Sequence, residues 1–361
     1  MRFPDFEGEW EKCKLGDVCN TSTGNKNTQD KIDDGIYPFY VRSQTVERVN
    51  SWTFDGEAIL TAGDGVGVGK VFHHTYGKIG VHQRVYILSN FKCDANYLFH
   101  FFSSKFYNRV KRMSAKNSVD SVRKEMITDM PLSLPCHKEQ VKIGRLLTLL
   151  DERIATQNKI IEDLKKLKSA IIEKLYKGIQ GTWYSYRQLF SIINERNKQL
   201  EYSNVLSASQ ERGMVSREDL NLDIHFERSN ISTYKIVKNG DYVIHLRSFQ
   251  GGFAFSEKTG ICSPAYTVLR PNNLLVYGYL SNYFTSRDFV KSLIIVTYGI
   301  RDGRSINVDE WLDMKVVIPS KEQQTHIINV IESIENKIKN EETYSNYLLN
   351  QKQYLLRQMF I

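Results

Sequence analysis

The chain has 361 residues, 41% of them hydrophobic, which is enough for two or three domains with real cores. Its formal net charge of +8 fits either an ordinary basic protein or one that binds a polyanion. The N-terminus lacks a signal-peptide core, and no run approaches the roughly 18 apolar residues of a membrane span. Five scattered cysteines without a C-x-x-C pair predict neither disulfides nor zinc, so we expect a cytoplasmic protein.

The pattern in residues 1–135 predicts a first α+β unit. Short β-type runs at 37–41, 58–63, 69–74 and 84–89 alternate with Asp-Gly turns. Apolar residues at three- and four-residue spacing then predict a helix from Ala95 to Met113.

A glycine-rich run, AGDGVGVGKV from Ala62 to Val71, resembles a phosphate-binding loop but fails that test. A Walker A motif needs glycine where Asp64 stands and Ser or Thr where Val71 stands. Two interpretations stay open. The glycines supply positive φ angles in a hairpin, or they let the backbone approach a DNA phosphate with Lys70 beside it.

Residues 136–178 predict one long helix with a coiled-coil seam. Its apolar residues recur every 3.5 positions, as in a coiled coil, and polar Gln157 and Lys168 interrupt them. A polar residue in a seam fixes register and partner at some loss of stability. The seam residues are Ile143, Leu147, Leu150, Ile154, Ile161, Leu164, Ile171 and Leu175.

The second half of the chain repeats this plan at a fixed offset. Residues 179–318 carry β-type runs at 241–246, 251–256 and 265–270, and a helix predicted from Val276 to Leu293. Residues 319–361 repeat the long helix, with Pro319 standing 184 residues after Pro135 (319 − 135). Its seam residues are Ile327, Ile331, Ile334, Ile338, Leu348, Leu355 and Met359, and its polar breaks are Glu341 and Lys352.

These patterns predict an α+β protein with two pseudo-symmetric α/β domains joined by two long antiparallel coiled-coil helices. Antiparallel packing would place Ile143 near Met359 and Leu175 near Ile327. The alternative is two independent amphipathic helices, each packed on its own domain.

No catalytic constellation is identifiable in the sequence. The chain has no Pro-Pro pair, which the Asn/Asp-Pro-Pro-aromatic motif of adenine methyltransferases requires, and no H-E-x-x-H cluster. We interpret His73-His74 as a surface turn, and the carboxylates of Asp5, Glu7 and Glu9 as a chance likeness to a nuclease in a flexible N-terminus. We therefore expect a chain without catalytic or metal-ligating residues.

Basic side chains interleaved with Tyr and Phe gather late in each half, as on nucleic-acid-binding surfaces, although a solvated helix face has the same composition. The second half also places Arg and Gln, which read guanine and adenine, where the first half has its glycine-rich run. The candidate DNA-binding residues are Lys70, Lys78, Arg84, Arg109, Arg112, Lys116, Arg247, Ser248, Gln250, Arg301 and Arg304.

The whole chain resembles the DNA specificity subunit of type I restriction–modification systems. The resemblance rests on FEGEWEKCKLGDV (Phe6 to Val18), the helix from Lys138 to Ile154 with its copy from Lys321, and the matched segments SVRKEM and SINVDE. It implies two target-recognition domains that each read half of a split double-stranded DNA sequence. It also implies helices that bind two methyltransferase subunits and, through them, restriction/translocase subunits. S-adenosylmethionine, ATP and magnesium chemistry would then belong to those partners, with no cofactor in this chain.

Two other classes of function stay open. One is a stand-alone DNA methyltransferase or nuclease, which methyl transfer by the purified chain alone would support. The other is a coiled-coil adaptor with protein-binding lobes, which failure to bind duplex DNA at low salt with the partner present would favour.

Overall fold

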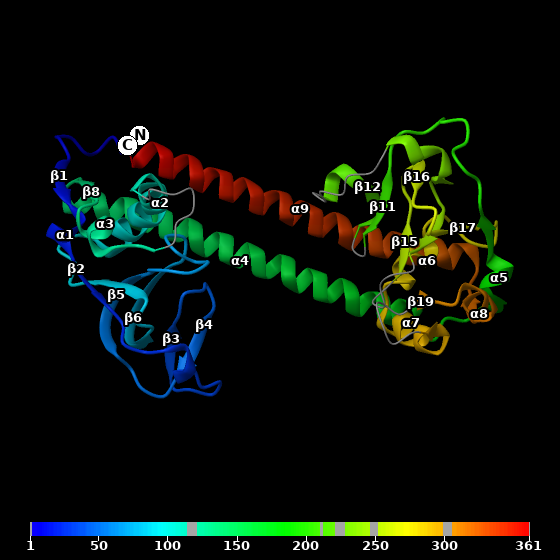
Figure 1. The fold of residues 1–361 in the computed structure, drawn as a ribbon, viewed down its shortest axis with the longest axis horizontal. Coiled ribbons are helices and arrows are strands. Elements are labelled where there is room, and N and C mark those ends of the chain that lie inside the picture. The colour runs from blue at the N-terminus through cyan, green and yellow to red at the C-terminus, as the bar shows by residue number, and fades with distance from the viewer. Residues whose placement is uncertain are drawn as a thin grey trace. The chain divides into compact units, whose positions relative to one another are not determined.

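A computed structural model describes residues 2–113, 121–209, 212–220, 228–245, 252–298 and 305–360 (Figure 1). Helices and sheets are mixed, which confirms the predicted α+β class. The chain divides into two compact units: Met1–Asn158 with Thr343–Ile361 form unit 1, and Lys159–Glu342 form unit 2. The long helices α4 (His137–Tyr176) and α9 (Lys321–Met359) each contribute one part to each unit.

Unit 1 is built on a six-stranded sheet in the order β2-β7-β5-β6-β3-β4. Neighbouring strands are antiparallel except β3 and β6, which are parallel. The elements of this unit besides the long helices are β1 (Glu11–Lys14), α1 (Leu15–Val18), β2 (Asn20–Thr23), η1 (Thr28–Asp30), β3 (Tyr37–Tyr40), β4 (Val46–Val49), β5 (Phe54–Ala62), β6 (Phe72–Val81), β7 (Val85–Ser89), α2 (Ala95–Met113), α3 (Lys124–Thr128) and β8 (Pro131–Leu134).

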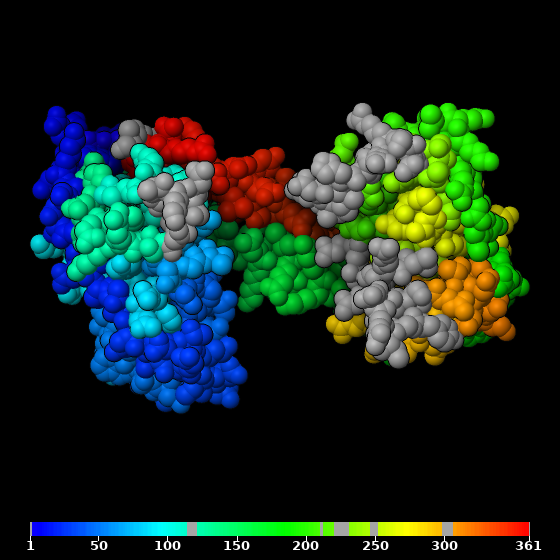
Figure 2. Space-filling view, in the orientation of Figure 1, coloured from blue at the N-terminus to red at the C-terminus, as the bar shows by residue number. Residues whose placement is uncertain are grey.

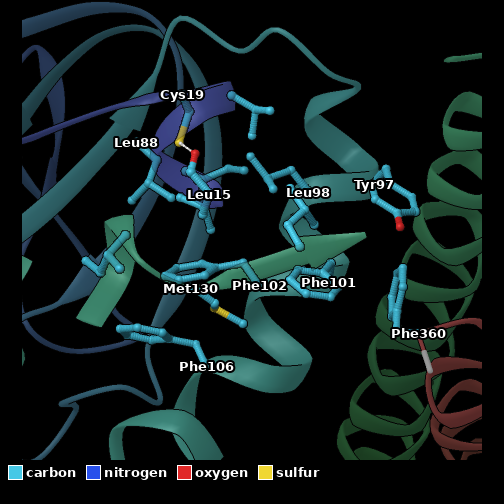
Figure 3. Close-up of a cluster of buried hydrophobic side chains, with 14 of the residues drawn as sticks. Leu15, Cys19, Leu88, Tyr97, Leu98, Phe101, Phe102, Phe106, Met130 and Phe360 are labelled. Carbon is cyan, nitrogen blue, oxygen red and sulfur yellow. Dashed lines mark hydrogen bonds between the residues drawn. The ribbon is translucent and has the colours of Figure 1, made fainter. Parts of the chain in front are cut away.

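Helix α2 forms the core of unit 1 with its apolar stripe, as the spacing predicts. Leu98, Phe102 and Phe106 are buried against the sheet and against Met130, which follows α3 (Figure 3). Phe360, just after α9, closes this core, because its ring packs edge-on against Tyr97 at a centroid distance of 5.3 Å.

Unit 2 has a four-stranded sheet in the order β10-β17-β14-β15, the same antiparallel pattern as β2-β7-β5-β6 of unit 1. Its elements are β9 (Thr182–Ser185), α5 (Tyr186–Leu189), β10 (Phe190–Ile193), β11 (Leu206–Ser209), β12 (Gly213–Ser216), η2 (Arg217–Leu220), η3 (Arg228–Thr233), β13 (Lys235–Val237), β14 (Tyr242–Ile244), β15 (Phe253–Phe255), β16 (Gly260–Cys262), β17 (Thr267–Pro271), α6 (Tyr279–Tyr283), α7 (Arg287–Ser292), η4 (Leu293–Val296), β18 (Thr297–Tyr298), β19 (Ser305–Ile306), α8 (Val308–Asp313) and β20 (Lys315–Ile318).

We call the short strands and helices that flank each sheet its frame: β1, α1, α3 and β8 in unit 1, and β9, α5, α8 and β20 in unit 2. The two frames are alike, and single hydrogen bonds recur in both. Leu15 N donates to Met130 O at 2.9 Å, and Tyr186 N donates to Met314 O at 3.0 Å. The acceptors Met130 and Met314 are 184 residues apart (314 − 130), the offset found in the sequence. Beside these bonds, Asp129 and Asp313 each hold a cation that stands at the start of the short helix, Lys14 in unit 1 and Arg187 in unit 2.

A buried glutamine joins each sheet domain to its long helix. In unit 1, Gln140 Oε1 accepts from Asp94 N at 2.9 Å, and its Nε2 donates to Pro135 O at 2.8 Å. In unit 2, Gln324 Oε1 accepts from Val276 N at 2.8 Å, and its Nε2 donates to Leu274 O and Pro319 O. Both amides therefore satisfy backbone groups that would otherwise be buried without partners.

Within each unit, α4 and α9 contact each other as antiparallel packing predicts. Ile143 and Met359 share the core of unit 1, and Leu175 packs on the core of unit 2 that contains Ile327. All predicted seam residues are buried or half-buried. The two seam lysines pair across the helices: Lys168 Nζ lies 2.6 Å from Glu335, and Lys352 binds Asp151, whereas Glu341 pairs with Lys337 on its own helix.

The interhelical pair Lys168–Glu335 should contribute to the stability of unit 2. Because both side chains are partly exposed, we expect Lys168→Glu to lower the free energy of unfolding by about 1 kcal/mol, and Glu335→Lys added to it to restore most of that loss. Urea unfolding of the single and double variants measures this coupling. The pair Lys166–Glu162 lies on one helix and serves as the matched control, since its swap should change little. Equal coupling in both pairs would contradict a role of the seam lysine in register.

Three sequence predictions are wrong in detail. The helix predicted from Val276 to Leu293 is two short helices, because the Ser286 side chain accepts from Phe289 N and caps α7. His73 and His74 lie in strand β6, half-buried, and not in a surface turn. The N-terminal segment is packed on α4: Arg2 pairs with buried Glu139 at 2.8 Å, and Asp5 pairs with Lys142.

The two chain ends meet on unit 1. Figure 2 shows the end of α9, in red, close to the dark blue N-terminal residues, and Phe3 and Trp10 pack on the core that contains Phe360. Among the described residues, no helix is long and apolar enough to cross a membrane.

Candidate nucleic-acid interface

The glycine-rich run is the connecting loop of the β5–β6 hairpin, which confirms the hairpin interpretation. We call residues 63–71 the glycine loop. Gly65 and Gly69 have φ angles of +76° and +64°, which favour glycine. A Cβ atom on Gly67 would lie 2.2 Å from the carbonyl oxygen of Arg42, so this backbone approach also requires glycine.

Three cations surround the glycine loop. Asp64 holds two of them, since its carboxylate lies 3.0 Å from Arg42 Nη1 and 3.7 Å from Arg84 Nε. The third, Lys70, is exposed, and its ammonium lies 4.8 Å from the ring centroid of Tyr107 on α2. We call Arg42, Lys70 and Arg84 the cationic cluster.

A buried histidine positions the backbone of Arg84. His82 Nδ1 accepts from Arg84 N at 3.0 Å. Burial and then the Arg42 cation lower the pKa of His82, so the ring stays neutral and keeps this acceptor at physiological pH. Arg42 and His82 were missed in the sequence analysis, because only the fold brings them to the glycine loop from the segments that follow β3 and β6.

The C-terminal half of α2, whose Tyr107 and Val110 face the loop, also carries basic side chains on another face. Arg112 is exposed, while Arg109 donates from Nε to Met126 O at 2.8 Å and from Nη2 to Asp129 O at 2.9 Å. Arg109 therefore secures α3, and its guanidinium is largely occupied. Lys105 and both arginines line a surface groove together with Phe101 and Met130.

Lys78 lies away from the cationic cluster. It pairs with Asp55 on β5, near the end of the hairpin opposite to the glycine loop, and its ammonium lies 5.3 Å from the ring centroid of Trp52. Lys78 lies six positions along β6 from Phe72, or about 20 Å away. Lys70 and Lys78 therefore cannot bind the same phosphate.

In unit 2 the hairpin equivalent to β5–β6 is β14–β15, and the connection between its two strands differs in sequence from the glycine loop. That connection contains Arg247, Ser248 and Gln250, which lie outside the described residues, as do Lys116, Arg301 and Arg304. The described part of the chain holds no cluster of His, Cys, Asp or Glu side chains that could bind a metal ion.

If the cationic cluster and Arg112 bind phosphates, DNA affinity should fall steeply as salt rises, because each neutralised phosphate releases counterions. We expect Arg112→Glu to weaken binding roughly tenfold on every sequence and to reduce the slope of log affinity against log salt by about one. Fluorescence anisotropy with unrelated duplexes at several salt concentrations tests this. Lys12→Glu, an exposed charge reversal on β1, is the control. An affinity that does not change between low and physiological salt would contradict the prediction.

This chain is similar to proteins of type I restriction–modification systems. Residues 7–166 match the family model of the type I restriction modification DNA specificity domain. The type I restriction enzyme EcoDI specificity subunit of Escherichia coli is 27% identical over 174 residues, which cover 47% of this chain and 38% of that protein. The MjaVIII specificity subunit of Methanocaldococcus jannaschii is 29% identical over 194 residues, which cover 50% of this chain and 44% of that protein. Each match thus spans less than half of the relative's length.

Two solved structures are similar to this chain in fold. The S subunit of a type I restriction–modification system from M. genitalium has a TM-score of 0.62 at 13% identity, covering 99% of this chain and 97% of its own. A chain from a study of complex assembly and conformational transition of the type I R-M system has a TM-score of 0.61, also at 13% identity, covering 99% and 98%. At this identity the likeness shows the fold alone.

The chain therefore has the fold of these S subunits. Residues 7–166 belong to the type I restriction modification DNA specificity domain family. The resemblance predicted from the sequence is thereby confirmed.

Proposed function

We propose that the chain is the DNA specificity subunit of a type I restriction–modification complex and reads a bipartite, asymmetric target. The observation that carries this proposal is the duplicated frame, in which the equivalent hairpins β5–β6 and β14–β15 have connections of different sequence. A repeated frame gives both units the same way of approaching a duplex, while different connections give them different bases to read. The cationic cluster in unit 1 supplies the phosphate contacts that such reading needs.

The chain itself would be non-catalytic, with two methyltransferase subunits docked on the long helices and restriction/translocase subunits bound through them. The outer faces of these helices support docking, because large apolar side chains are exposed there: Val141, Leu149, Ile160 and Leu167 on α4, and Tyr347, Leu349 and Tyr354 on α9. S-adenosylmethionine, ATP and magnesium would act in the partners.

Co-expression with the partner methyltransferase, followed by mapping of methylated adenines in the host genome, tests the proposal. We expect methylation at one split sequence with two different half-sites and a fixed gap, and none when either protein is expressed alone. Methylation by this chain alone would indicate a stand-alone enzyme. A complex that assembles but does not bind duplex DNA at low salt would indicate an adaptor.

A further inference from the structure

Val66 stands out on the glycine loop because its side chain is fully exposed, at 100%. The valines that follow it, Val68 and Val71, are buried and anchor the loop in unit 1. Backbone hydrogen bonds close the loop further, from Val68 N to Gly65 O at 3.1 Å and from Lys70 N to Gly67 O at 3.0 Å. The loop therefore holds one apolar side chain outward on an anchored, hydrogen-bonded backbone.

A single exposed apolar residue is ordinary on a protein surface. What distinguishes Val66 is its setting among charges. The cationic cluster surrounds the loop that carries it, and Asp64 ties Arg42 and Arg84 to the base of this loop.

This arrangement matches the chemistry of a DNA groove. Phosphates line both edges of the groove, where cations bind them, and base edges lie between. In the major groove the one apolar group that the bases present is the 5-methyl group of thymine. An apolar side chain exposed on a loop that also carries cations is therefore suited to contact that methyl group.

We propose that Val66 is a specificity-determining residue that contacts a thymine 5-methyl group in the half-site read by unit 1. This inference rests on the proposed function and deepens it. It commits the glycine loop to the major groove, since the minor groove presents no methyl group.

The first test compares methylation maps. The complex is formed with wild-type chain, Val66→Ala, Val66→Thr and, as a matched control, Ile36→Ala, which shortens another exposed side chain (70%) of unit 1. We expect Val66→Ala to relax the sequence at one thymine position of one half-site and to leave the other half-site unchanged. Val66→Thr keeps one γ-methyl group, which alanine lacks, and should preserve the wild-type preference. Ile36→Ala should have no effect.

The second test uses purified complex and target duplexes in which single thymines are replaced by uracil, which lacks only the methyl group. One replacement should weaken wild-type binding about fourfold, the value of one buried methyl group, and should not weaken binding of Val66→Ala.

The outcomes separate the two proposals. Absence of any split methylated sequence with the wild-type chain would overturn the proposed function itself. A defined wild-type target that Val66→Ala reads unchanged would overturn only the role of Val66. Equal loss of activity in Val66→Ala and Val66→Thr, with unfolding temperatures at the wild-type value, would also overturn it, because it would show a role other than methyl contact.

Discussion

Removing seven residues from each long helix should shorten the gap between the two half-sites by roughly three base pairs. Seven residues span about 10 Å of helix, and B-DNA rises 3.4 Å per base pair. The suitable segments are Gln157–Asp163 and Glu341–Tyr347, which are equivalent at the 184-residue offset. They include Asn158 and Ser345, whose side chains bond to each other at 3.0 Å, so neither is left without its partner. Methylation mapping should then show the same half-sites with a shorter gap and loss of the original target.

The structure favours survival of the fold in this variant. The interhelical pairs Asp151–Lys352 and Lys168–Glu335 lie outside the deleted segments and are retained. Seven residues are close to two helical turns, so the apolar seams still face each other after the deletion. Removal of five residues from each helix is the control, because it turns the seams about 140° away from each other and should abolish assembly. A gap that does not respond to the seven-residue deletion would refute the idea that helix length sets it.

Local patterns predicted much of the fold. The seam of α4 and α9 and the stripe of α2 are periodic arrays whose period alone fixes the buried face. The break between α6 and α7 was missed because apolar spacing continues across it. The polar run Thr285-Ser286 was the available signal, since Ser286 caps the second helix. His73 and His74 were misjudged because polar residues can also occupy a strand, and only the register of β6 with β5 shows that they do.

The candidate interface was less predictable, because its contacts join residues far apart in the chain. Lys70 and Arg84 could be chosen by charge, but nothing local indicates that Asp64 links Arg84 to Arg42. Arg109 was likewise chosen because it is basic. Its hydrogen bonds to Met126 and Asp129 could not be predicted, because they depend on how α3 folds back on α2. The glycine loop was the exception, because positive φ angles favour glycine and the repeated glycines are visible in the sequence.

The buried glutamine that joins each long helix to its sheet domain should be a sensitive polar site. Gln324 is 1% exposed and satisfies Val276 N, Leu274 O and Pro319 O. Gln324→Ala leaves three backbone groups without this partner, each worth about 1–3 kcal/mol when buried. Allowing for water entering the space, we expect a loss of roughly 2–4 kcal/mol in the free energy of unfolding of unit 2, measured by urea denaturation.

The neighbouring glutamine provides a matched control on the same helix. Gln323 is exposed, so Gln323→Ala should change the free energy of unfolding by less than about 0.5 kcal/mol. Gln140→Ala should repeat the large effect in unit 1, because Gln140 bonds Asp94 N and Pro135 O in the same way. Hydrogen exchange can assign each loss to its unit, since the amides of Val276 and Asp94 should lose protection in the respective variants. Equal effects of Gln323→Ala and Gln324→Ala would mean that helix propensity, and not the joint to the sheet domain, determines the loss.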